Sequence, residues 1–73
     1  MDVRTRQFLR RKEVVRITGV PASTLYELIG RGDFPKPVRL TPRLVGWDAE
    51  EILHWQKARI AARDAQRRAP LPA

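Results

Sequence analysis

The sequence predicts a small, mainly α-helical fold in which two short helices precede a β-hairpin and a longer third helix follows it. Three observations favour this order. Apolar residues recur at helical spacing in two short runs before residue 32. Apolar residues then alternate with other residues on both sides of a turn at Pro42. A helix-capping pattern begins at Asp48 and introduces the third helix.

The two short helices have clear start and stop signals. The first is expected from Arg11 to Thr18, because Gly19 follows its last apolar residue and glycine readily ends a helix. Pro21 favours the start of a second helix, which is expected from Ala22 to Arg31. The apolar positions that carry this pattern are Leu9, Val14, Val15, Ile17, Leu25, Leu28 and Ile29.

The hairpin and the third helix complete the predicted fold. Residues 38–40 and 45–47 alternate between apolar and other residues on either side of Pro42. Asp48, with Glu51 three residues later, resembles a capping box. A helix pair followed by a hairpin and a helix has the order of a winged helix-turn-helix, which is therefore the predicted fold class.

This domain is expected over residues 9–65. Residues 1–8 are expected to form a flexible basic arm, and residues 66–73 a frayed tail. The chain has no cysteine, which excludes disulfides, thiolate zinc sites and cysteine nucleophiles. It also has no apolar run near the roughly 18 residues of a membrane span, so a cytoplasmic protein without membrane contact is expected.

The charge balance favours an anionic partner. The 73 residues include 15 Lys and Arg against 8 Asp and Glu, for a net charge of +7 and an isoelectric point near 11.3. Arginine supplies 12 of these cations, and its planar donors suit phosphate oxygens and guanine edges. A genome that favours arginine codons is the alternative explanation of the total charge. The basic segments, however, flank the predicted helix pair, where the phosphates of a bound DNA would run.

The outward face of the second helix is the candidate surface for reading DNA. With Leu25 facing the core, a rotation of 100° per residue turns Ser23 and Glu27 outward. Such small polar side chains suit a major groove. The candidate contacts on this face are Ser23, Thr24, Tyr26, Glu27 and Arg31. The alternatives are a Tyr26 ring that covers the first helix and a Ser23 hydroxyl that caps the second.

Basic residues around this helix are the candidate phosphate contacts: Arg10, Arg11, Lys12, Lys36, Arg39 and Arg43. The first three place positive charge at a helix N-terminus, against the helix dipole, which favours an external anion there. Arg43, at the hairpin turn, is better placed than Arg39 to contact DNA from the wing. The alternative for both is a solvated hairpin edge that prevents strand pairing.

The remaining polar and aromatic residues indicate no catalytic, metal or cofactor site. His54 has no second His or Cys at ligand spacing, and Glu50 and Glu51 point apart on a helix. A nucleophile–base pair and a phosphate-binding loop are also missing, so an enzyme is not expected. Trp47 and Trp55 are assigned to the core rather than to a ligand.

Six short runs follow one another in a specific order within a stretch from about Leu9 to Arg63 over which the chain resembles a known family. They are Leu9-Arg10-Arg11-Lys12-Glu13-Val14, Thr18-Gly19-Val20, Ser23-Thr24-Leu25-Tyr26, Phe34-Pro35-Lys36-Pro37-Val38, Pro42-Arg43 and Val45-Gly46-Trp47. Together they resemble the AlpA family of prophage regulators, relatives of phage excisionases and of MerR-type winged helices. The resemblance implies a transcriptional regulator that acts on integrase or excision functions of a mobile element. It also implies that the helix with Ser23-Thr24-Leu25-Tyr26 is the recognition helix, in which Ala22 is a further candidate DNA contact, and that the Pro42-Arg43 hairpin is the wing.

The chain departs from this family pattern at Pro21, Ala22 and Glu27, where the family has a capping residue, an arginine and a basic residue. A glutamate that faces DNA is repelled by phosphate unless it accepts from a cytosine amine or pairs with Arg31. The DNA sequence that relatives bind is therefore not carried over to this chain.

The leading prediction is a sequence-specific double-stranded DNA-binding transcriptional regulator. The alternative is an excisionase-like architectural or adaptor protein that recruits a recombinase or polymerase subunit. Leu53 and Ile60 form a second apolar stripe on the third helix, which either widens the core contact or meets a protein. The expected partners are therefore DNA, other copies on adjacent sites and an integrase.

Overall fold

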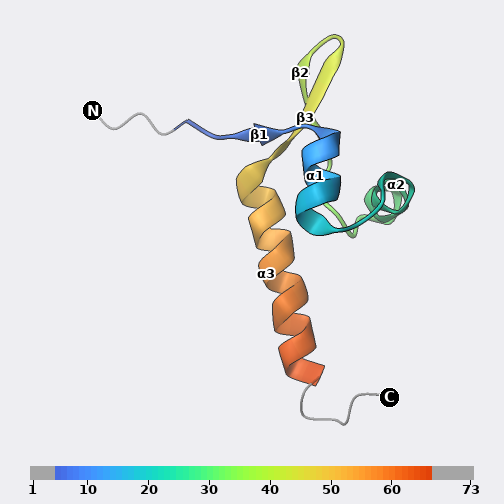
Figure 1. Ribbon diagram of the computed structural model, residues 1–73, viewed down its shortest axis with the longest axis vertical. Helices are drawn as coiled ribbons and strands as arrows, with labels where there is room; N and C mark the ends of the chain where they lie inside the picture. The colour runs from blue at the N-terminus through green and yellow to red at the C-terminus, as the bar shows by residue number, and fades with distance from the viewer. Residues whose placement is uncertain (1–4, 67–73) are drawn as a thin grey trace.

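The computed structural model describes residues 5–66 (Figure 1). Its elements, in chain order, are β1 (Phe8–Leu9), α1 (Arg11–Thr18), α2 (Ala22–Arg31), β2 (Val38–Thr41), β3 (Leu44–Asp48) and α3 (Ala49–Gln66). The three helices and the small antiparallel sheet confirm the predicted winged helix-turn-helix class.

The turn between α1 and α2 is fixed by local contacts. Gly19 ends α1 at a φ of 74°, a left-handed conformation that favours glycine, and its amide donates to the Val15 carbonyl at 2.9 Å. The Thr18 hydroxyl donates to the Val14 carbonyl at 2.7 Å and accepts from the Val20 amide at 3.2 Å. The bounds of both helices, Arg11–Thr18 and Ala22–Arg31, are those predicted from the sequence.

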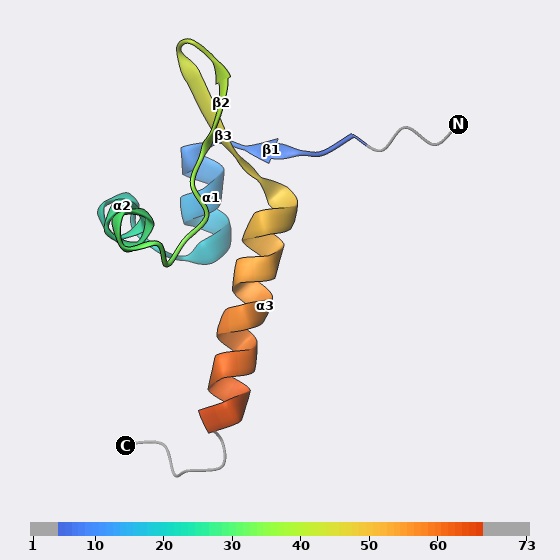
Figure 2. The same cartoon turned by 180° about the vertical axis from the view of Figure 1, so that it is seen from behind.

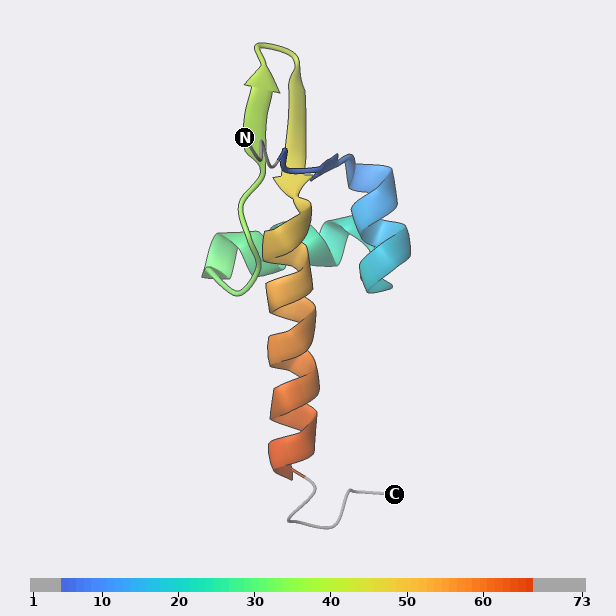
Figure 3. The ribbon, with the colours of Figure 1, turned by 90° about the vertical axis from the view of Figure 1, so that its left-hand side faces the viewer.

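The hairpin and α3 project in opposite directions from the helix pair (Figures 2 and 3). The sheet has the order β1-β3-β2, with Val38 opposite Gly46 and Arg39 opposite Val45. An irregular register follows Arg39. The far end of the β2–β3 hairpin extends beyond the helices as a wing (Figure 1).

The core lies where the sheet meets the three helices. Its buried residues are Leu9, Val14, Leu25, Phe34, Trp47 and Ile52. The Trp47 indole donates to the Pro35 carbonyl at 3.0 Å, and the Trp55 indole donates to the Asp33 carbonyl at 2.8 Å. The Trp55 ring also packs edge-on against Phe34, with centroids 4.9 Å apart. Both tryptophans thus have the predicted structural role.

The N-terminal segment differs from the expected flexible arm through residue 8. Phe8 and Leu9 pair with β3 as a third strand. Arg6 lies 3.0 Å from Asp48 Oδ2 through Nε, and 3.0 Å from Glu50 Oε2 through Nη2. A two-residue strand is too short to show alternation, and it pairs with a distant segment, so no local pattern indicates it.

The C-terminal limit also differs from the expected domain boundary. Helix α3 runs through Gln66, which was expected to begin the tail. Residues 1–4 and 67–73, which hold the rest of the expected arm and tail, lie outside the described residues.

Asp48 connects the N-terminal segment, β3 and α3, and its removal is expected to destabilise the domain. Its Oδ1 accepts from the Glu50 amide at 2.9 Å, which caps α3, while Oδ2 faces Arg6. We expect Asp48→Ala to lower the free energy of unfolding by about 1–2 kcal/mol through the lost cap. Arg6→Ala should cost under about 1 kcal/mol, because the Arg6 side chain is 55% exposed. Urea denaturation measures both, and equal losses would contradict the capping role.

Candidate nucleic-acid interface

A hollow on the surface joins the start of α1, the middle of α2 and the hairpin. We call it the basic groove, and its lining residues are Arg10, Arg11, Lys12, Val15, Tyr26, Arg43 and Val45. Four cations, an aromatic ring and two valines therefore surround one space. Five of the twelve residues predicted to contact DNA meet there although they come from three separate elements.

The α1 side of the groove is suited to hold an anion. Arg10, Arg11 and Lys12 are exposed at the first turn of α1, where the helix dipole adds further positive potential. The one carboxylate of this turn, Glu13, turns back and accepts from the Arg10 amide at 3.3 Å. Its charge is thus used to cap the helix.

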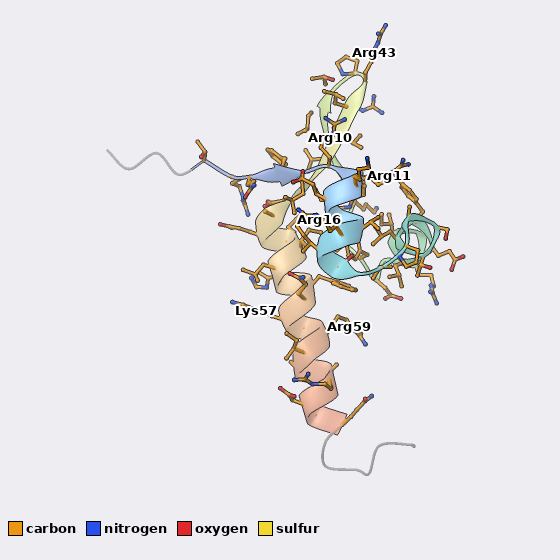
Figure 4. The ribbon with its side chains drawn as sticks, viewed as in Figure 1. Arg10, Arg11, Arg16, Arg43, Lys57 and Arg59 are labelled. Carbon is orange, nitrogen blue, oxygen red and sulfur yellow. The ribbon has the colours of Figure 1, made fainter. Side chains whose placement is uncertain are left out.

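On the wing side, the groove is lined by Arg43 and Val45. Figure 4 shows Arg43 at the tip of the hairpin, and Arg10 and Arg11 at the end of α1 nearest the hairpin. The Thr41 hydroxyl accepts from the Arg43 amide at 3.2 Å, which holds the turn. By contrast, the Arg39 guanidinium is held against the hairpin by its bond to the Pro42 carbonyl at 3.4 Å. Arg43 is therefore the better placed of the two to meet a phosphate.

The α2 side contributes the Tyr26 ring to the groove. This side chain is 47% exposed and lines the groove together with Val15 of α1, so it faces solvent beside the first helix. The other predicted α2 residues lie outside the groove lining. Ser23, Glu27 and Arg31 are exposed, whereas Ala22 and Thr24 are half-buried.

Lys36 is also outside the groove lining. It is exposed in the loop between α2 and β2, and Arg31 is exposed in the last turn of α2. The structure therefore divides the predicted cations into a group that meets in the groove and a group that lies beyond it.

Sequence reasoning missed three residues at or near this surface. Val15 and Val45 form the apolar part of the groove lining, and they were assigned only to core spacing and strand alternation. Arg16, outside the groove lining, is an exposed cation on α1 one turn after Lys12 (Figure 4). The four-residue spacing of Lys12 and Arg16 places them on neighbouring parts of the helix surface and was a usable signal.

Two other kinds of feature were sought in the part of the chain that the structure describes, metal-ligand clusters and membrane-spanning helices. Within residues 5–66, no group of three His, Cys, Asp or Glu side chains is arranged to hold a metal ion. In the same part of the chain, every helix is too short or too polar to cross a bilayer.

Comparison with known proteins identifies the family of this chain. The model of the family described as prophage CP4-57 regulatory protein (AlpA) matches residues 7–60, from the N-terminal strand into α3. The chain is also similar to a protein of Enterobacteria phage P4 that is described as uncharacterized protein ORF88. The two are 42% identical over 62 residues, which cover 85% of this chain and 70% of the phage protein. The chain therefore belongs to the AlpA family of prophage regulatory proteins.

Proposed function

We propose that the chain is a cytoplasmic, sequence-specific double-stranded DNA-binding regulator of transcription in a prophage or mobile element. The observation that carries this proposal is the basic groove, in which cations from α1 and the wing surround a space that Tyr26 of α2 also lines. The groove offers donors for phosphate oxygens, and membership of a prophage regulatory family supports a regulatory rather than a catalytic role.

In this proposal, α2 enters the major groove and the surrounding cations hold the DNA backbone. Ser23 and Glu27 are exposed on α2 and supply base contacts. Arg10 and Arg43, on opposite sides of the basic groove, bind phosphates and fix the position of α2.

Selection of bound duplexes from a random DNA pool at moderate salt tests the proposal. We expect an enriched motif, because base contacts from α2 discriminate between sequences. If about six phosphates are neutralised, the logarithm of the affinity should fall against the logarithm of salt with a slope near −5. A pool without enrichment would leave only charge-driven binding and would contradict sequence-specific recognition.

Glu27→Gln is expected to change the ranking of DNA sites. Glu27 is an exposed carboxylate on α2, which repels phosphate and accepts from a cytosine amine, whereas glutamine pairs with adenine. We expect discrimination at one base pair to shift by about 1–3 kcal/mol. Repeated selection with the variant measures this, with Glu51→Gln on α3 as the matched control. An unchanged ranking would contradict the placement of α2 in the groove of DNA.

A recruiting function is the second candidate, and exposed apolar residues on α3 favour it. Leu53 and Ile60 are 49% and 51% exposed, so they do not widen the core. In this role the chain would bring an integrase or a further copy to its DNA site. Sedimentation on a duplex with repeated sites tests the contact between copies, because strictly independent binding would contradict it.

A further inference from the structure

Gly46 lies in the middle of β3, the central strand of the sheet, between β1 and β2. Glycine is depleted in strands because it has no side chain to pack there. Gly19 and Gly32 end helices at a positive φ, which favours glycine, whereas the φ of Gly46 is not positive. Its backbone conformation is therefore open to any residue, and the space around it must account for the glycine.

The two neighbouring strands leave little room for a side chain at this position. A Cβ atom built on Gly46 would lie 3.0 Å from Leu40 Cδ1 of β2, 3.2 Å from Phe8 Cβ of β1 and 3.4 Å from the Leu9 carbonyl oxygen. Carbon atoms in favourable contact are about 3.5–4.0 Å apart. A Cβ atom on any of the other three glycines that the structure describes would meet no such neighbour within 4 Å.

The contacts with β1 involve its backbone, whereas the contact with β2 does not. Cδ1 of Leu40 is the end of a flexible side chain, which can rotate away from an added carbon. Phe8 Cβ is bonded to the backbone and the Leu9 oxygen is part of it, so these atoms move only if β1 moves. Since β1 is an edge strand of two residues, an added side chain at Gly46 would push it away from β3.

The strand β1 leads directly into the basic groove. Arg10 is the single residue between Leu9 of β1 and Arg11 of α1, and its backbone is extended at a φ of −81° and a ψ of 161°. Its side chain lines the groove together with Arg43 of the wing (Figure 4). The position of Arg10 in the groove therefore depends on how closely β1 lies against β3.

We propose that Gly46 is a positioning residue for the basic groove, because it lets β1 lie close against β3 and so holds Arg10 opposite Arg43. A side chain at position 46 would displace β1 and with it the Arg10 guanidinium. The consequence for DNA binding rests on the proposed function, whereas the position of Arg10 is measurable without DNA.

The position of Arg10 is tested first in the absence of DNA. The chain has no cysteine, so Arg10→Cys with Arg43→Cys provides the only two sites for nitroxide labels. Electron paramagnetic resonance then measures the distance between the labels. We expect Gly46→Val to widen the distribution of this distance about twofold, because the added carbons do not fit beside Phe8 and Leu9. An unchanged distribution would overturn the proposal.

Titration of duplex DNA tests the consequence for binding. If Arg10 neutralises one phosphate, Gly46→Val should weaken binding about fivefold at physiological salt and flatten the salt slope by about 0.9. In the Arg10→Ala background the same substitution should weaken binding by less than about twofold, because the side chain that it displaces is already absent. An equal loss in both backgrounds would show that Gly46 acts through another residue, and the positioning role would be wrong.

A control separates this role from a general loss of stability. Ile52→Val removes a methyl group from a buried residue of α3 and lowers stability from a position outside the sheet. It should leave the label distance and the salt slope unchanged, and effects as large as those of Gly46→Val would contradict the proposal.

Two further provisions keep the test decisive. Gly46→Ala adds one carbon and replaces Gly46→Val if the valine variant does not fold, with a smaller change expected in the same direction. If the unaltered chain does not bind duplex DNA, the proposed function is wrong, and the label distances alone decide whether Gly46 sets the position of Arg10.

Discussion

Replacing Trp47 with alanine is expected to lower the free energy of unfolding by about 3–5 kcal/mol. The side chain is fully buried in the core and donates its indole N–H to the Pro35 carbonyl. Chains of this length have a total stability of roughly 4–11 kcal/mol, at 0.05–0.15 kcal/mol per residue. The substitution therefore removes a large part of what holds the sheet to the helices. Urea denaturation followed by circular dichroism measures the loss.

A second substitution separates packing from hydrogen bonding at the same position. Trp47→Phe keeps most of the apolar volume and loses the indole donor, so we expect a smaller loss, of about 1–3 kcal/mol. Leu53→Ala, at a half-exposed position, should change stability by about 0.5 kcal/mol or less. If Trp47→Ala destabilised the domain no more than Leu53→Ala, Trp47 would not be the centre of the core.

The elements best predicted from the sequence are those whose limits are set by adjacent residues. Gly19 and Pro21 fixed the end of α1 and the start of α2, because a left-handed glycine and a proline act on the backbone where they stand. Asp48 likewise caps α3 through a bond to the next residue but one. By contrast, β1 depends on pairing with β3 some forty residues later, and Arg6 depends on the same contact.

The candidate site likewise has a part that local sequence predicts and a part that depends on contacts between distant segments. The sequence predicted each cation of the basic groove, since charge and exposure follow from residue type and helical phase. It did not predict the groove, because the distance from Arg10 to Arg43 is determined only when the sheet packs against α1. Within the hairpin, the turn position of Arg43 already favoured it over Arg39 in the sequence, and the structure adds that Arg39 donates to the Pro42 carbonyl.

Removing three cations of the basic groove together is expected to have the largest effect on DNA binding. The triple variant Arg10→Ala, Arg11→Ala, Arg43→Ala takes charge from both sides of the groove. If each residue neutralises one phosphate, the salt dependence should flatten by about 2.7 in slope, at about 0.9 per phosphate. At physiological salt this corresponds to an affinity loss on the order of 10²-fold. Titration of duplex DNA at several salt concentrations measures both quantities.

The pattern of this loss separates backbone contacts from base contacts. Because phosphates are the same in every duplex, the triple variant should weaken preferred and scrambled sequences by similar factors and leave their ranking intact. Lys57→Ala removes a cation from α3, outside the groove lining, and should leave the salt slope nearly unchanged. If the triple variant kept the full slope, or if Lys57→Ala lowered it as much per charge, the phosphates would be held elsewhere. A changed ranking of sites would instead place these arginines at base edges, with α2 displaced from the centre of the major groove.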